Sequence, residues 1–386
     1  MISIIKRCSS AIIVLWLCAF VDLSESLATS RQRRSAKSKE KSKKTSKGFG
    51  NPVPKASPTN TFTADASEPT RQLLKFLDDE EVEGLEVVEL GFEANEDGLR
   101  GVFCKEPLQK GDYICAIPFV STVLIDETFF VDPPEERLTA ARLENAVKFL
   151  EFSKHPKQHQ TDFQPYLDCL PQLGDSTFDP TPDFWSEEEI RQLEIPRFVE
   201  EMIARKRDLE RMAKEQQNEE GDVQVTCQEL QHAAWLVRTR AFTTLKKAIT
   251  LDGTEGLLQR TVMIPFLDMI NHDSQSQNAE LQVVETKEYE ESFYALTATK
   301  PITRGSQIQI GYGTGSDTSL ELFGKYGFLP TKNEKNDLDR ISELLKDVKW
   351  STSLKEDQEE YDFATGTRKT ILSIRIYFKE LQSRQK

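Results

Sequence analysis

The 386-residue chain has 38% hydrophobic and 30% charged residues, a composition typical of a globular protein with one large or two smaller domains. The net charge of −14 conceals an asymmetry, because residues 1–64 hold 12 lysines and arginines against three acids, which leaves −23 for the remainder. This acidic body argues against a nucleic-acid groove as the main function, since phosphate binding requires clustered positive charge.

Residues 1–28 have the three parts of a secretory signal peptide. Lys6 and Arg7 precede an apolar run from Ala11 to Val21, and small residues follow near Ser24 and Ala28. The apolar run covers only about half of the hydrocarbon core of a membrane. We therefore expect this segment to be cleaved from the chain, and we expect no stable membrane anchor to remain after cleavage.

Residues 29–64 are rich in serine, lysine and arginine and poor in acids, so they predict a disordered basic leader or linker. Behind a signal peptide, this composition resembles the bipartite leader of algae whose plastids are reached through the secretory route. A solvated linker on an endoplasmic-reticulum or secreted protein fits equally well. The sequence predicts entry into the secretory route and leaves both destinations open.

The body from about residue 84 begins with strand signals. An apolar segment at Val82–Leu90 is followed by short runs at Gly101–Cys104, Tyr113–Ile117 and Ser121–Ile125, which together predict a small β-meander. Strand signals return much later in the chain, at Val262–Phe266, Leu281–Val284, Phe293–Leu296 and Ile308–Tyr312.

Helix signals lie between the two groups of strands. Ser186–Glu189 and Thr226–Glu229 have the capping-box form that begins helices, and the second opens an apolar face that runs from Leu230 to Ala248. The charged stretch Arg197–Glu220 predicts an exposed helix, and Thr318–Glu321 begins a short helix that ends near Gly327. The order predicts an α+β fold of small β-sheets with a helical insertion at about 130–255 and a charged helical tail at 331–386.

The cysteines show no C-x-x-C spacing, which argues against a structural metal site. We expect free, buried thiols at Cys104, Cys115, Cys169 and Cys227, while their pairing into disulfides stays open.

Three passages carry the functional signal: Asp97–Val102, Phe266–His272, and Gly311–Gly313 followed by Glu321–Phe328. Each alone fits an ordinary turn, strand end or loop. In this order, with a helical block after the first, they resemble the SET-domain methyltransferases, and most of all the branch that contains the Rubisco large-subunit lysine methyltransferase. The resemblance runs from about Gly84 to Pro330 and implies a SET-domain body at 65–330.

The resemblance implies S-adenosylmethionine as the cofactor and assigns its binding to Asp97, Gly98, Leu99, Arg240, Asn271 and His272. Arg240 matches an arginine that meets the carboxylate of the cofactor. On the predicted helix Arg238 and Arg240 both flank the apolar face, so only the resemblance prefers Arg240.

The resemblance also implies that Tyr312 is the catalytic tyrosine, that Asp268 lies near the substrate, and that Tyr326 and Phe328 form the wall of a lysine channel. These residue types suit methyl transfer, because an apolar channel disfavours a charged ammonium and a hydroxyl stabilises the charge that moves to nitrogen. Tyr326 and Phe328 also fit simple core packing.

The expected function is therefore a protein-lysine N-methyltransferase, monomeric and without metal, that acts on a non-histone protein. Two alternatives stay open: a protein-histidine methyltransferase, against which the aliphatic Leu267 argues, and a catalytically silent SET fold that binds proteins, against which the intact Tyr312 argues. The chain departs from the family at Thr318-Ser319, where asparagine is common, and in a helical C-terminal region of about 56 residues. It also lacks the cysteine cluster of zinc-bearing histone enzymes.

Overall fold

The computed structural model describes residues 62–94, 98–131, 143–156, 161–174, 181–218, 225–250, 252–273, 275–285, 292–313, 315–330 and 334–384. The predicted signal peptide, most of the predicted leader and Asp97 lie outside these ranges. The last residues assigned to the leader are part of the fold, because strand β1 (Phe62–Ala64) pairs with β2 and the Phe62 ring stacks on Phe103 at 4.5 Å.

Within the described residues the strands form four small sheets. The first contains β1, β2 (Val88–Glu93) and β3 (Arg100–Cys104), and the second contains β4 (Tyr113–Pro118), β10 (Ser292–Ala298) and β9 (Ala279–Glu285). The third contains β5 (Val123–Phe130), β7 (Glu255–Met263) and β6 (Ala241–Ile249), and the fourth joins β8 (Asn271–His272) to β11 (Gln309–Ile310). The predicted α+β class is confirmed.

The predicted β-meander is wrong. Strands β3, β4 and β5 do form, but each belongs to a different sheet, and β4 and β5 pair with strands far along the chain. The 3-10 turn η2 (Phe119–Ser121) separates β4 from β5, where the chain passes from one sheet to the next. Apolar runs identify strands, but they carry no information on which partners complete the hydrogen bonds.

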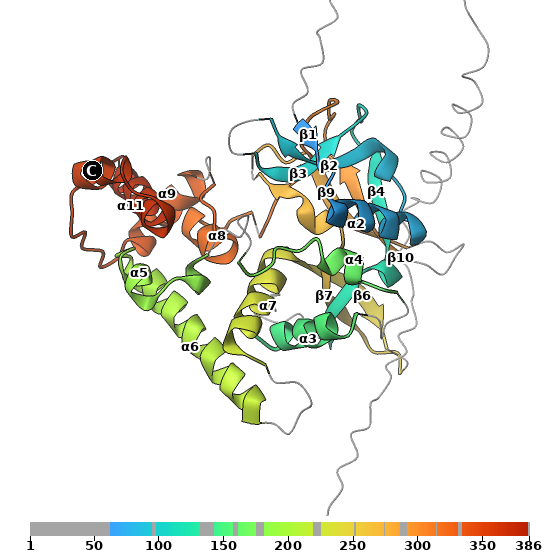
Figure 1. Cartoon of the computed structure of the whole chain (residues 1–386), viewed down its shortest axis with the longest axis horizontal. Helices are drawn as coiled ribbons and strands as arrows, with labels where there is room; N and C mark the ends of the chain where they lie inside the picture. Colours follow the sequence, from blue (N-terminus) through green and yellow to red (C-terminus); the bar gives the residue numbers. More distant parts are fainter. Residues whose placement is uncertain are drawn as a thin grey trace, which may run out of the picture.

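The helical insertion contains α3 (Leu143–Lys154), α4 (Gln164–Leu167), α5 (Glu187–Arg191), α6 (Pro196–Asn218) and α7 (Cys227–Arg240). Both predicted capping boxes are confirmed, since Ser186 and Thr226 exchange hydrogen bonds with the glutamates three residues later. Helix α2 (Glu68–Asp79) lies before β2 and covers one end of the sheets (Figure 1).

Helix α7 ends at Arg240, although the apolar spacing predicts that it continues to Ala248. Residues 241–249 instead form β6, which pairs with β7 along its whole length. The β-branched Thr243 and Thr244 favour a strand, and the long β7 supplies the hydrogen bonds that a continued helix would have made internally. As a result Arg240 stands at the helix-to-strand junction.

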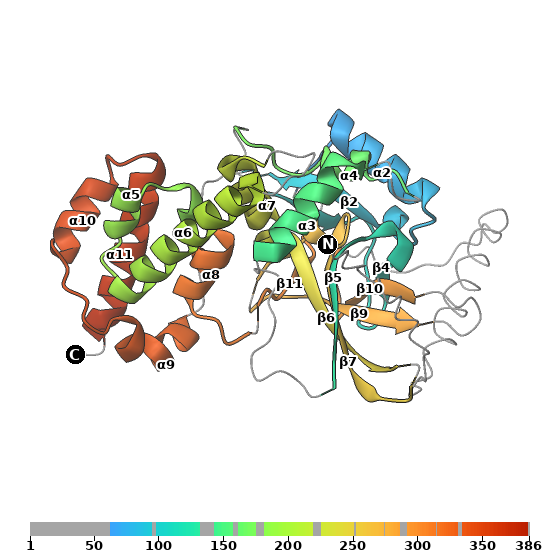
Figure 2. The ribbon, with the colours of Figure 1, turned by 90° about the horizontal axis from the view of Figure 1, so that it is seen from below.

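The C-terminal region has its own hydrophobic core. Helices α8 (Ser319–Tyr326), α9 (Glu334–Leu344), α10 (Leu354–Tyr361) and α11 (Gly366–Arg384) pack with α5 and α6, and they form a separate lobe in both ribbon views (Figures 1 and 2). Ile371, Ile374, Phe378 and Leu381 of α11 are buried in it. This region is a packed helical unit, so the short tail is not merely a charged appendage.

Cys104, Cys115 and Cys169 are buried free thiols, as expected, whereas Cys227 is free but only partly buried. Among the described helices, none combines the length and the apolar composition that crossing a membrane requires.

Candidate functional site

The short parallel pair of β8 and β11 brings two distant passages together. Asn271 lies opposite Gln309 and His272 opposite Ile310. The chain then continues from β11 into Gly311-Tyr312-Gly313, so Tyr312 reaches the Asn-His pair from which it is 40 residues distant in sequence. Two of the three passages singled out in the sequence therefore meet at one place.

Tyr312 is fixed to this crossing by both its backbone and its side chain. Its amide N–H donates to Nδ1 of His272 at 2.7 Å, and its hydroxyl donates to the carbonyl oxygen of Ile270. Burial raises the pKa of the Tyr312 hydroxyl far above its ordinary value, so the group stays protonated at physiological pH. Because its proton is held by Ile270, the hydroxyl oxygen can present its lone pairs in other directions.

Aromatic rings surround Tyr312. The Tyr326 ring lies 4.9 Å from the Tyr312 ring, and the Phe328 ring lies 6.4 Å from Tyr312 and 5.6 Å from the His272 ring. Tyr326 and Phe328 stay partly exposed, unlike true core residues. They come from the end of α8 and the residues after it, so the second half of the third passage lies at the same site as Tyr312.

The start of β3 borders the site through its backbone. The Asn271 side-chain amide donates to the carbonyl oxygen of Arg100 at 2.8 Å. A Cβ at Gly101 would lie 2.8 Å from that amide nitrogen and 2.4 Å from Nε2 of Gln307, so a larger residue there would displace these two side-chain amides. Leu99 is half exposed and precedes this contact, which places the Gly98-Leu99 segment beside Asn271.

Asp268 is the buried anion of the site. Its side chain is fully buried, the Tyr166 hydroxyl donates to Oδ2 at 2.8 Å, and Nη1 of Arg240 lies 3.4 Å from the same oxygen and 3.2 Å from the Asp268 carbonyl oxygen. Burial raises the pKa of Asp268, and the Arg240 guanidinium opposes that rise. Phe266, two residues earlier, has φ of +71°, a strained conformation at the turn that presents Asp268.

Sequence reasoning missed Tyr166. It comes from α4, a four-residue helix in the insertion, and nothing in its local sequence points to Asp268, which lies 102 residues away. The structure also distinguishes Arg238 from Arg240, which both flank the apolar face of the helix predicted from the sequence. Arg240 faces Asp268, whereas Arg238 is buried against Asp183.

The family model of the SET domain matches residues 99–313, more than half of the chain, and the chain belongs to the SET-domain family. Among solved structures it is similar to the SET domain of LSMT bound to lysine and AdoHcy, with a TM-score of 0.58 and 16% identity over 82% of this chain and 90% of that one.

Two related structures match as well. The SET domain of LSMT bound to MeLysine and AdoHcy has a TM-score of 0.58 at 16% identity, over 83% of this chain and 91% of that chain. Rubisco LSMT bound to sinefungin and monomethyllysine has a TM-score of 0.56 at 16% identity, over 82% and 90%. At this identity the likeness shows the fold. No curated protein sequence matches significantly.

The His272 contact predicts a pH dependence. Burial lowers the pKa of His272 below its ordinary 6.5, and only a neutral Nδ1 accepts from the Tyr312 amide. The unfolded chain therefore takes up this proton at a higher pH than the folded chain. The stabilising contribution is complete above about pH 6.5 and is lost as pH falls towards the folded pKa.

The measurement is the free energy of unfolding of the wild type and of His272→Asn, whose amide oxygen still accepts from Tyr312, between about pH 8 and about pH 5. The other histidines cancel in the difference. We expect the difference between the two proteins to shift in favour of the variant as pH falls. A difference that does not change with pH would show that His272 is not held neutral.

Proposed function

We propose that this chain is an S-adenosylmethionine-dependent protein-lysine N-methyltransferase that acts on a non-histone protein. The observation that carries the proposal is the convergence of the Tyr312 hydroxyl, the Asn271-His272 pair and the partly exposed rings of Tyr326 and Phe328 at one crossing of the chain. These residues come from segments that are far apart in the sequence, and core packing alone does not require such a set of residue types there.

The residues present fit the cofactor. Nε of Arg240, Nε2 of His272 and Oδ1 of Asp268 are buried and have no hydrogen-bond partner among the described residues. A cationic donor, an imidazole N–H and a carboxylate oxygen are suited to the carboxylate, the polar ring edges and the ammonium group of an amino-acid nucleoside. Arg240, Asn271 and His272 would hold S-adenosylmethionine, and the bound cofactor supplies a methyl group on a positively charged sulfur.

The protein supplies alignment and the environment for the acceptor. The rings of Tyr312, Tyr326 and Phe328 form an apolar lining that disfavours the charged ammonium, because burial penalises the charged form of a lysine. The neutral amine then has a lone pair to offer. The lone pairs of the Tyr312 hydroxyl stabilise the positive charge as it moves towards the acceptor nitrogen, and confinement of the acceptor lowers the entropic cost of the encounter.

Cofactor binding tests the first half of the proposal. Asn271→Ala removes the amide that bridges to the Arg100 carbonyl, and we expect it to weaken S-adenosylmethionine binding by about 1–3 kcal/mol, the cost of a lost buried polar partner. The measurement is titration calorimetry on the folded chain. Asn145→Ala, at a buried asparagine in α3, is the control and should leave the affinity unchanged. If the wild type and Asn271→Ala bound S-adenosylmethionine equally well, Asn271 would not be part of the cofactor site.

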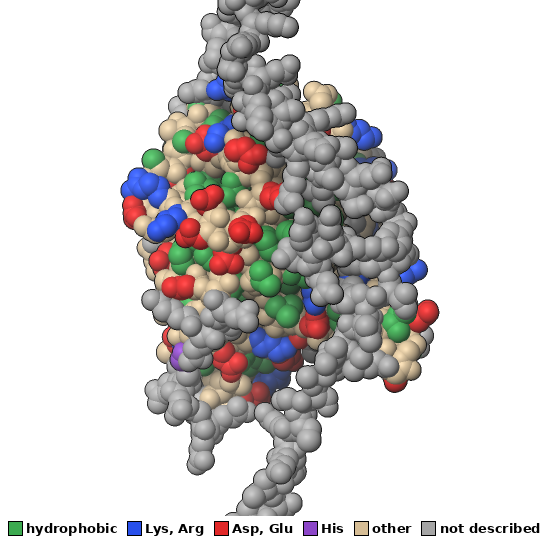
Figure 3. All heavy atoms as spheres, turned by 90° about the vertical axis from the view of Figure 1, so that its right-hand side faces the viewer, with side chains coloured by type: hydrophobic (Ala, Val, Ile, Leu, Met, Phe, Trp, Pro, Cys, Tyr) green, Lys and Arg blue, Asp and Glu red, His purple; other side chains and the backbone are tan. Residues whose placement is uncertain are grey.

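The non-histone acceptor is inferred from the leader and from the composition. Passage through the secretory route, as proposed, would keep the protein away from chromatin. Acidic side chains are spread over the described part of the face in Figure 3, which suits a basic acceptor segment. The proposal covers two destinations, the plastid and the endoplasmic reticulum or beyond.

The leader has its own test. A fluorescent reporter fused to residues 1–64 should enter the secretory route and be cleaved between about Ser24 and Thr29, because the basic start and the short apolar run form a signal peptide. Microscopy and the size of the processed reporter give the readout. Replacing the apolar run by serines is the control that should leave the reporter in the cytosol. A wild-type fusion that stays in the cytosol would contradict the proposed route.

A further inference from the structure

A buried ionic cluster lies beside the proposed acceptor channel. We call Asp183, Arg205 and Arg238 the Asp183 cluster. Asp183 is 2% exposed in the 3-10 turn η4 (Pro182–Phe184), and both of its oxygens accept from the Arg238 guanidinium of α7. Nε of Arg205, on α6, lies 2.7 Å from Oδ1 of the same carboxylate. The cluster thus joins three segments of the insertion.

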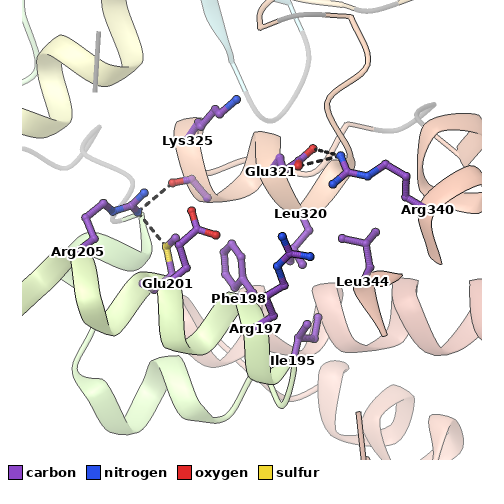
Figure 4. A pocket seen from close by; sticks show the side chains of 12 residues that line it. Ile195, Arg197, Phe198, Glu201, Arg205, Leu320, Glu321, Lys325, Arg340 and Leu344 are labelled. Carbon is purple, nitrogen blue, oxygen red and sulfur yellow. Dashed lines mark hydrogen bonds and ion pairs between the residues drawn. The ribbon is translucent and has the colours of Figure 1, made fainter. Parts of the chain in front are cut away.

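Each arginine also contacts the last turn of α8. Nε of Arg238 donates to the carbonyl oxygen of Lys325 at 3.0 Å, and Nη2 of Arg205 donates to that of Gly324 at 3.0 Å, the contact drawn in Figure 4. Carbonyls in the last turn of a helix have no partner within the helix and lie at its negative end, so cations hold them well. The next residue is Tyr326.

Thr181, the residue before η4, lies close to Gly327, which separates Tyr326 from Phe328 in the sequence. Gly327 ends α8 with φ of +85°, and a Cβ there would lie 2.7 Å from Cγ2 of Thr181. The Thr181 hydroxyl in turn donates to Oδ2 of Asp183 at 2.7 Å. The carbonyls of Gly324 and Lys325 are therefore held by the two arginines, and Gly327 lies close to Thr181.

We infer that the Asp183 cluster is a positioning device that sets the Tyr326 and Phe328 rings against Tyr312 and thereby the fit of the acceptor side chain. The inference rests on the proposed function. Burying three charges is a costly way to stabilise a fold, since a well-packed apolar triad often serves as well. Here both arginines donate to carbonyl oxygens of the helical turn that precedes Tyr326, so the cluster is placed to orient that ring.

Asp183→Asn tests the inference, because it keeps the shape of the side chain and removes the charge that orients both arginines. Asp357→Asn is the matched control. Asp357 is 1% exposed, also lies between two cations, Arg375 and Lys379, and comes from α10 in the C-terminal lobe. Both variants lose a buried carboxylate, but only Asp183 is linked to the end of α8.

The readouts are the KM for a basic lysine-containing peptide used as the acceptor, kcat, the affinity for S-adenosylmethionine and the number of methyl groups added. We expect Asp183→Asn to raise the acceptor KM about 10- to 100-fold, since small misplacements of a reactant cost that much. It should alter the methyl number and leave cofactor affinity within about twofold, while Asp357→Asn changes none of these per folded molecule. Equal effects of the two variants would reduce the cluster to a structural role and overturn the inference.

Amide hydrogen exchange of the peptide that contains residues 319–328 gives a second readout that does not need activity. When each variant is compared with the wild type at the same free energy of unfolding, set by denaturant, exchange at Tyr326–Phe328 should rise in Asp183→Asn and not in Asp357→Asn. If Asp183→Asn does not fold, Arg205→Lys, which keeps the charge and loses the planar fork, should give a smaller change in the same direction. If the wild type transfers no methyl group, the proposed function fails while the exchange result still decides the positioning role.

Discussion

Tyr312→Phe should reduce the rate of methyl transfer about 10²- to 10³-fold, a loss of about 3–4 kcal/mol, because it removes one oriented polar group from a site where charge develops. The substituted ring still packs against Tyr326, and the backbone amide still donates to His272, so the site should keep its shape. Cofactor affinity should therefore remain nearly unchanged, since the hydroxyl acts on the transferring charge and not on the resting cofactor.

The measurement is single-turnover transfer at saturating cofactor, with cofactor binding measured on the same samples. Tyr294→Phe is the matched control, because Tyr294 is also buried, in β10, and stacks on Phe119 away from the crossing. It should transfer at the wild-type rate. If Tyr312→Phe did so too, the catalytic assignment would be wrong, and the reading of the chain as a silent SET fold that binds proteins would gain support.

Asp357→Asn should destabilise the folded chain by about 3–5 kcal/mol, since removing one partner of a buried ionic group leaves the other charges uncompensated. Asp357 accepts from Nε of Arg375 at 3.0 Å and from Nζ of Lys379, both on α11 and both nearly fully buried. Thr352 also donates to it. The carboxylate therefore ties α10 and the preceding loop to α11.

Denaturant unfolding, followed by a far-ultraviolet signal, measures this effect. Lys355→Ala is the control, because Lys355 pairs with Glu359 on the exposed face of α10 and such surface pairs contribute little. A loss for Asp357→Asn no larger than that of the control would mean that the C-terminal helices do not depend on this cluster, and that the second core is held by its apolar residues alone.

Local patterns in the sequence predict the elements of this fold well. The capping boxes at Ser186, Thr226 and Thr318 are all present, and the left-handed Gly327 ends α8 where its sequence indicates. These features depend on residues three or four apart, which a sequence displays directly. Strand partners could not be predicted in this way. The pairing of β4 with β10 joins residues about 180 apart, and no local pattern encodes such a pair.

The end of α7 shows the same limit. The spacing from Leu230 to Ala248 fits a helix throughout, but β7 provides a partner for residues 241–249 and the chain becomes a strand. Tertiary contacts override a weak local preference here. That change of structure at Arg240 matters for the site, because the side chain at the junction is the one that reaches Asp268.

The candidate site was predictable where its residues belong to motifs that the family resemblance includes, and unpredictable where it depends on buried partners outside those motifs. Asn271, His272, Tyr312, Tyr326 and Phe328 all converge, as the resemblance implies. Tyr166 and Asp183 could not be found, because a lone tyrosine or aspartate in a helical insertion is unremarkable until the fold places it beside Asp268 or Arg238. The role of Asp97 stays a prediction, since it lies outside the described residues.

The most direct test of the central claim is methyl transfer by the full chain itself. The purified protein is incubated with S-adenosylmethionine carrying an isotopically labelled methyl group and with a protein extract, and tandem mass spectrometry then locates the label. The proposal predicts label on lysine Nζ of one or a few proteins, dependent on Tyr312. Label on a histidine ring, or no transfer by a folded chain that binds the cofactor, would contradict it.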